Sequence, residues 1–129
     1  MKSDLDRIQG SWRIRSLIID GSAPSFRMIG EARVKIRDGH FESHGMAAAF
    51  AGLIRLDASR RPKSFSIKFT RGPEKGNVHH GIYDLRANRW RICLAAKGGP
   101  APHDFVSEPG SGFLMEVLER DVDPPAPGA

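Results

Sequence analysis

The chain has 129 residues, of which 40% are hydrophobic and 27% charged, and its formal net charge is +5. This composition fits one globular domain and excludes an intrinsically disordered chain. The N-terminus lacks the apolar segment of a signal peptide, no apolar run is long enough to cross a membrane, and the single cysteine has no partner for an internal disulfide. We therefore expect a soluble, cytoplasmic protein.

The predicted elements begin with one short helical turn, which Ser3 and Asp6 can cap. Eight strand-like runs follow, at residues 12–19, 32–37, 40–44, 50–56, 64–69, 80–85, 90–94 and 113–120. Alternating apolar and polar residues identify most of these runs, and turn-forming pairs such as Asp38-Gly39 separate them. For the fourth run, helix is the competing interpretation, because residues 46–51 are rich in helix formers.

Strands joined by short turns usually pair with their neighbours in sequence. The pattern therefore predicts an all-β protein: a single antiparallel up-and-down β-barrel of about eight strands, with a short N-terminal helical turn. Closure into a barrel also removes exposed sheet edges, although an open sandwich is the alternative. The predicted barrel domain spans residues 1–120, and residues 121–129, which contain three prolines, are predicted to form a flexible tail.

Three residues near the two ends are predicted to close the floor of this barrel. Gly10 and Trp12 open the first strand, and Arg120 ends the last one. Trp12 can fill the narrow end of the barrel, and the Arg120 guanidinium can lie across its indole face. We expect this role to be structural.

The alternation in the last run conflicts with a simple inward position for Arg120. Phe113, Met115 and Val117 form the more apolar set, so the opposite set, which contains Glu116 and Arg120, is predicted to face outward. Either a bulge shifts the register or Arg120 wraps around the barrel floor.

The predicted interior favours a non-catalytic role in binding a small apolar or amphipathic molecule. The interior candidates are Ile14, Val34, Ile36, Phe65, Ile67, Tyr83, Trp90, Ile92 and Met115. Tyr83 or an arginine is expected to hold any polar head group of the ligand. This hypothesis predicts a cavity of a few hundred Å³, roughly the lower part of the range for ligand sites.

Four segments resemble an uncharacterised lipocalin-like domain family that is common in planctomycetes and verrucomicrobia. They are residues 4–12, Leu56-Asp57 with Pro62-Lys63, residues 81–85 with 91–95, and residues 109–112 with 118–120. The resemblance implies a bacterial protein with a calycin-like fold, and the family supplies no activity to transfer. The chain departs from the family at Ser64-Phe65, where an apolar–acidic pair is usual, so a bulkier phenylalanine narrows the interior.

Neither the histidines nor the acidic residues have the spacing of a catalytic or metal-binding group, so we predict no catalytic residue, metal or cofactor. Haem held by His80 or His103, as in nitrobindin-like barrels, is a remoter alternative. Asp84 and Glu116 are the acidic residues predicted to be partly buried. Each could anchor a cationic ligand, although pairing with an arginine is the more frequent arrangement. Cys93 is predicted to be a buried, inert thiol.

The basic composition supports an alternative function on the outer surface. In that reading the barrel is solidly packed and acts as a scaffold that binds an anionic protein partner. The basic residues are scattered along strands and turns, which favours a solvated face over a nucleic-acid surface. The sequence gives no indication of the oligomeric state.

Overall fold

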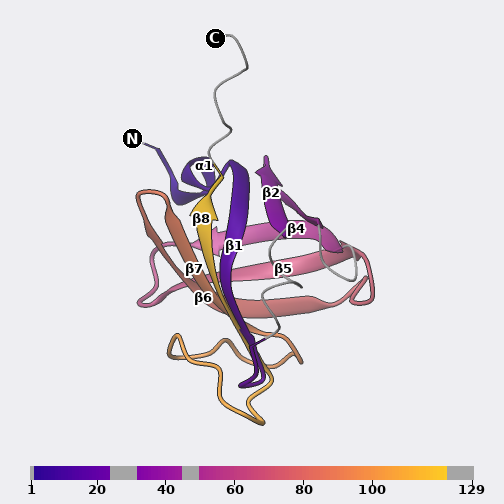
Figure 1. Cartoon of the computed structure of the whole chain (residues 1–129). Helices are drawn as coiled ribbons and strands as arrows, with labels where there is room; N and C mark the ends of the chain where they lie inside the picture. Colours follow the sequence, from indigo (N-terminus) through magenta and orange to yellow (C-terminus); the bar gives the residue numbers. More distant parts are fainter. Residues whose placement is uncertain (1, 24–31, 45–49, 122–129) are drawn as a thin grey trace.

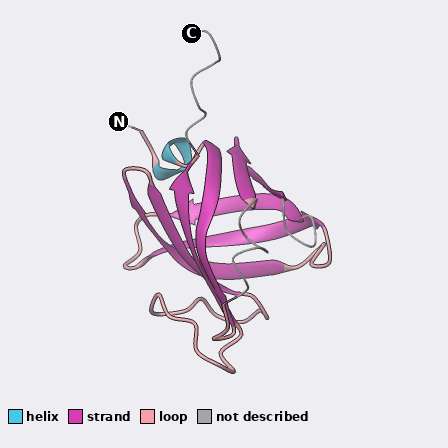
Figure 2. Ribbon diagram, viewed as in Figure 1, coloured by secondary structure: helices cyan, strands magenta, loops and turns pink. Residues whose placement is uncertain are grey.

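The computed structural model describes residues 2–23, 32–44 and 50–121, and it confirms the predicted fold class. The sheet is a closed barrel in which each strand pairs antiparallel with the next and β8 pairs with β1 (Figures 1 and 2). The elements are α1 (Asp4–Arg7), β1 (Gly10–Ile19), β2 (Arg33–Arg37), β3 (His40–His44), β4 (Phe50–Asp57), β5 (Lys63–Arg71), β6 (Val78–Arg86), β7 (Arg89–Ala95) and β8 (Phe113–Arg120).

Helix α1 lies at one end of the barrel, beside the end of β8 (Figure 1). As predicted, Ser3 and Asp6 form a capping box: the Asp6 N–H donates to Ser3 Oγ at 3.1 Å, and the Ser3 N–H donates to Asp6 Oδ2 at 3.3 Å. After α1, the carbonyl of Ile8 accepts a 2.8 Å hydrogen bond from Trp12 Nε1. The helical turn is thereby tied to the first strand.

A bulge at Arg15 sets the register between β1 and β8. Ile14 pairs with Leu118, whereas Ser16 already pairs with Val117. The extra residue turns Leu17, together with Ile14 and Trp12, toward the barrel interior, where all three are buried. The bulge predicted near the end of the last strand as one explanation for Arg120 is not found there: the bulge lies in β1, and β8 pairs with β7 without a register shift.

The predicted orientation of β8 was wrong. The interior face of β8 carries Leu114 and Glu116, which line the cavity described below, and Leu118, which is fully buried. Arg120 has the same phase and pairs with Trp12 across the seam. Met115 faces the other way and pairs with Cys93 of β7 and Ile18 of β1. Both faces of β8 are apolar, so alternation alone could not orient it.

The connection over residues 96–112 explains why the outer face of this region is apolar. Residues of the connection contact the outward-facing side chains of β7: the carbonyl of Val106 accepts from Cys93 Sγ at 3.6 Å, and Arg91 lies over the Phe105 ring at 4.0 Å. Ile82 and Cys93, which pair on this face, are 3% and 0% exposed. The protein therefore has a small second apolar layer outside the barrel.

The boundary between the barrel and the tail differs from the prediction. Asp121 belongs to the barrel, because its carboxylate accepts hydrogen bonds from Arg13 and Arg33 at 3.2 and 3.0 Å and its N–H donates to the Ser11 carbonyl. Residues 122–129 of the predicted tail, and residues 45–49 of the segment rich in helix formers, lie outside the described residues. Phe50 and the residues that follow it form β4. The described part of the chain contains no helix with the length and apolarity that a membrane span requires.

Candidate functional site

The interior of the barrel holds a partly open cavity of about 240 Å³. Seven of the nine predicted interior residues line it: Ile14, Val34, Ile36, Phe65, Ile67, Trp90 and Ile92. The apolar lining also includes residues that were not among the site candidates: Leu17, Phe41, Phe50, Ile54, Phe69, Leu94, Ala96 and Leu114. Alternation in β5 places Phe69 on the inner face together with Phe65 and Ile67, which is a signal for at least this residue.

Phe65 narrows the interior but does not fill it. Its ring lies over Gly81, its partner on β6. A Cβ at Gly81 would come within 2.5 Å of Phe65 Cε1 and 2.6 Å of the Cys93 carbonyl oxygen, so only glycine fits between them. The aromatic ring therefore takes the space of the missing side chain, and the cavity remains beside it.

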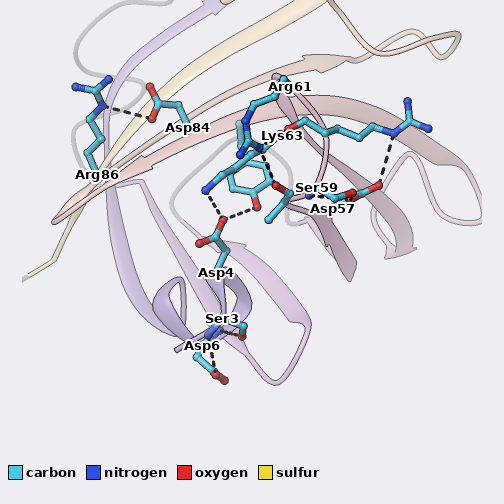
Figure 3. A network of polar contacts seen from close by, with 12 residues as sticks. Ser3, Asp4, Asp6, Asp57, Ser59, Arg61, Lys63, Asp84 and Arg86 are labelled. Atoms are coloured by element: carbon cyan, nitrogen blue, oxygen red, sulfur yellow. Dashed lines mark hydrogen bonds and ion pairs between the residues drawn. The ribbon is translucent and has the colours of Figure 1, made fainter. Parts of the chain in front are cut away.

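The other two predicted interior residues lie elsewhere. Met115 is on the outer face of β8, as described above. Tyr83 faces inward but lies at the floor, where its ring meets that of Phe65 edge to face at a centroid distance of 6.3 Å. Its hydroxyl donates to Asp4 Oδ2 at 2.7 Å, and Lys63 Nζ donates to the same oxygen at 3.0 Å (Figure 3). Tyr83 therefore fastens α1 to the barrel and takes no part in lining the cavity.

The contacts among Tyr83, Asp4 and Lys63 shift the pKa values of Asp4 and Tyr83 in opposite directions. Burial tends to raise the pKa of Asp4, but the hydrogen bonds from Tyr83 and Lys63 and the lysine charge outweigh it, so that the pKa lies below its usual range. Burial and the hydrogen bond to the Asp4 carboxylate raise the pKa of Tyr83. Asp4 is thus ionised and Tyr83 neutral, so the tyrosine hydroxyl can donate to the carboxylate and hold α1 against β6. We call this contact the Tyr83–Asp4 latch.

The three predicted barrel-closing residues meet at the same end. Arg120 lies over the Trp12 ring, and its Nη1 and Nη2 donate to the carbonyls of Gln9, at 2.8 Å, and of Arg7. Gly10 has φ +114°, and a Cβ there would come within 3.1 Å of Arg120 Nη1. Glycine at this position therefore leaves room for the guanidinium.

Glu116 is the acidic group on the β8 side of the cavity wall. Its strand neighbours across the ladder are Ile92 and Leu17, both apolar. Among the described residues, no side chain forms a hydrogen bond or an ion pair with its carboxyl group. Burial among apolar atoms raises the pKa of Glu116 to about 7. Near neutral pH, the folded protein therefore holds a carboxyl group that is divided between its neutral and ionised forms.

A second polar group at the cavity also lacks a partner. Trp90 lines the cavity and is 3% exposed, and no described group accepts a hydrogen bond from its Nε1. Because Trp90 pairs with Leu118 and Ile92 pairs with Glu116, Trp90 and Glu116 are diagonal neighbours on adjacent strands. The carboxyl group of Glu116 and the indole N–H of Trp90, both without a described partner, thus lie on the β7–β8 wall.

The polar groups of the β5–β6 side, in contrast, are paired with one another. His79 Nδ1 is 3.0 Å from the Ala95 carbonyl oxygen, and Nε2 is 3.2 Å from Glu74 Oε2. Asn77 also donates to Glu74, at 2.8 Å, and this bond contributes most to lowering the pKa of Glu74. The interior position of His79 follows from alternation in β6 and was not recognised among the candidates.

The two histidines named for the remoter haem alternative lie away from the cavity. His80 and His103 are exposed, and neither lines the cavity. His79 does, but both of its ring nitrogens already have partners. Within residues 2–23, 32–44 and 50–121, no three His, Cys, Asp or Glu side chains are grouped so that they could hold a metal ion.

Many of the basic residues on the outer surface form ion pairs. Asp84 is half-buried and pairs with Arg91 at 2.9 Å and Arg86 at 3.7 Å, so the arginine partner expected for this acid is confirmed. Arg13 and Arg33 share Asp121, and Lys63 pairs with Asp4. These pairs reduce the positive charge available for an anionic partner.

Cys93 is buried as predicted, beneath the connection over residues 96–112. Burial raises the pKa of its thiol, and the hydrogen bond to Val106 only partly offsets this effect. A thiol of this kind is a poor nucleophile. It lies on the outer face of β7 and does not line the cavity.

Comparison of the chain with models of protein families, with curated proteins and with solved structures finds no match.

Proposed function

We propose that the protein binds a small, predominantly apolar molecule inside the barrel. The observation that carries this proposal is the cavity of about 240 Å³, whose wall is almost entirely aliphatic and aromatic. An apolar cavity of about 150 Å³ is enough to hold benzene, so this volume suits a single aromatic ring with a short substituent. The interior arrangement supports binding, because most of the described residues that line the cavity are apolar.

The resemblance of residues 4–12 and the three later segments to a lipocalin-like family supports the same proposal. The family implies a calycin-like barrel, and barrels of this strand number have room for one small ligand. Membership of that family, and a cytoplasmic location, remain predictions.

Native mass spectrometry of the protein as purified tests whether a small molecule accompanies it. Titration calorimetry with benzyl alcohol then tests the cavity itself. The decisive variant is Val34→Phe, which places a ring in the cavity, since Val34 lines it and is 8% exposed. The matched control is Val78→Phe, because Val78 is 46% exposed on the outer face of β6.

We expect the wild-type protein and the Val78→Phe variant to bind benzyl alcohol equally and the Val34→Phe variant to lose binding. Circular dichroism verifies that both variants are folded. Absence of binding to the wild-type protein, or equal binding by both variants, would show that the cavity is not a ligand site.

A further inference from the structure

The β7–β8 wall of the cavity contains an acidic group, Glu116, that has no counter-charge among residues 2–23, 32–44 and 50–121. Glu116 faces apolar neighbours, and none of the described arginines or lysines pairs with it. The contrast with the other acids is clear, because Asp4, Asp84 and Asp121 each have a basic partner within 3.2 Å. A carboxylate that lies against apolar groups without a partner is unfavourable, and a cation brought beside it would relieve this cost.

We propose that Glu116 anchors a positively charged amino group of the bound molecule, so that the cavity selects small amphipathic amines. This inference rests on the proposed ligand-binding function and specifies the chemistry of the ligand. The apolar part of the amine would occupy the aliphatic and aromatic portion of the cavity. Its ammonium group would supply the charge that Glu116 lacks.

The energetic balance favours a cation here. In a buried ion pair, the removal of both charges from water normally offsets much of the attraction between them. In this barrel the carboxyl group already lies among apolar residues of the cavity wall before a ligand binds, so ligand binding adds mainly the desolvation of the ammonium group. A charge-assisted hydrogen bond formed in a low-dielectric cavity is also stronger than a neutral one.

Trp90 supports the same choice. Its ring belongs to the wall diagonal to Glu116, and the face of an indole attracts cations as well as apolar groups. An anionic ligand, in contrast, would place a second negative charge beside Glu116. The wall therefore distinguishes between ligands of equal size by their charge.

The test compares three probes of nearly the same size: benzylamine, benzyl alcohol and benzoate. Above pH 7 we expect benzylamine to bind about tenfold more tightly than benzyl alcohol, and benzoate to bind most weakly. In Glu116→Gln, which keeps the shape of the side chain, the advantage of benzylamine over benzyl alcohol should disappear. Glu119→Gln is the matched control, since Glu119 is exposed on the same strand.

The pH dependence supplies a second readout. Amine binding to the wild-type protein should strengthen as the pH rises through about 7, where the Glu116 carboxyl group ionises. The other titratable side chains on the cavity wall are Glu74 of the β5–β6 loop and His79 of β6, and they are hydrogen-bonded to each other. If the pH dependence persists in Glu116→Gln, it does not arise from Glu116 and the inference is wrong.

The outcomes separate the two proposals. If benzyl alcohol binds and benzylamine binds no better, Glu116 is not an anchor for cations, and the ligand-binding function stands. If none of the three probes binds, both proposals fail. An unchanged preference for the amine in Glu116→Gln would also overturn the role of Glu116.

Discussion

The guanidinium carbon of Arg120 lies 4.3 Å from the centre of the Trp12 indole ring, which joins the last residue of β8 to the third residue of β1. The same guanidinium donates to the carbonyls of Gln9 and Arg7. The Arg120 side chain therefore covers the Trp12 ring at the floor of the barrel. It also satisfies two backbone carbonyls, that of Arg7 at the end of α1 and that of Gln9 just after it. An ammonium group cannot reproduce this planar, forked geometry.

We expect Arg120→Lys to lower the free energy of unfolding by about 1–3 kcal/mol, because it loses the stacking and one of the two hydrogen bonds. Urea denaturation followed by tryptophan fluorescence measures the change. Arg89→Lys is the control: the residue is exposed at the start of β7, so its replacement should change stability by less than about 0.5 kcal/mol. Equal stability of the two variants would mean that Arg120 does not close the floor.

The fit between Gly10 and Arg120 can be tested with two glycine variants. Gly10 has φ +114° and Gly76 has φ +91°, so alanine is strained at both positions, by about 1–3 kcal/mol. A Cβ at Gly76 meets nothing within 4 Å, whereas one at Gly10 meets Arg120 Nη1 at 3.1 Å. Gly10→Ala should therefore be clearly the less stable variant in urea denaturation. Equal losses would show that backbone strain alone matters at Gly10.

The Tyr83–Asp4 latch predicts a particular pH dependence. The pKa of Asp4 in the folded protein lies below its ordinary value of 3.8. The stabilisation is therefore complete above pH 3.8 and is lost as the pH falls through the pKa of the folded state. Tyr83→Phe removes a hydrogen bond to this carboxylate and should cost about 1–3 kcal/mol at neutral pH, but less in acid. A cost that is the same at both pH values would contradict the latch.

Glu116 predicts the opposite behaviour. Its pKa rises from 4.5 to about 7 on folding, so the folded state holds the proton more tightly. Stability should fall as the pH rises between these values, by up to about 3 kcal/mol, and Glu116→Gln should remove this loss. Thermal unfolding between pH 4 and 8 measures the effect, with Glu119→Gln as the control. If the wild-type protein and Glu116→Gln lose stability in parallel, the carboxyl group is not buried in the cavity.

Cys93 is the single cysteine of the chain, so its rate of labelling measures how tightly the connection over residues 96–112 packs on β7. We expect a thiol reagent to modify it only after the connection over residues 96–112 moves away. Phe105→Ala removes the ring beneath Arg91 and should speed labelling about tenfold or more. Val106→Ala, at a side chain that is 50% exposed, is the control and should change the rate little. Fast labelling of the native wild-type protein would contradict the packing.

The fold was predictable because most strands bury one face only. In β2, for example, buried Val34 and Ile36 alternate with Arg33, Lys35 and Arg37, and Asp38-Gly39 marks the turn. Seven of the interior candidates followed from this rule. Trp12 and Arg120 were likewise paired from their positions at the two ends of the barrel.

The orientation of β8 was not predictable from alternation, because its outer face adjoins that of β7, on which the connection over residues 96–112 packs. Apolar residues then occur in both phases, and ranking the phases by hydrophobicity favoured the one without Glu116. The predicted contact between Trp12 and Arg120 was sufficient to orient β8. If Arg120 shares the inner phase with Trp12, then Leu118, Glu116 and Leu114 must do so as well. The charge of Glu116 lowered the hydrophobicity of the inner phase, so Glu116 was not selected as an interior residue.

The pairing of β1 with β8 also determines when the cavity forms during folding. The hydrogen bond from Arg120 to Gln9 joins residues 111 positions apart, and β8 supplies both Leu114 and Glu116 to the wall. During synthesis, which proceeds from the N-terminus, the first seven strands leave the ribosome before the eighth. Contacts between such distant residues also form slowly. The proposed ligand can consequently bind only molecules in which β8 has closed the barrel. Its presence during refolding should stabilise the closed barrel without accelerating the folding steps that precede closure.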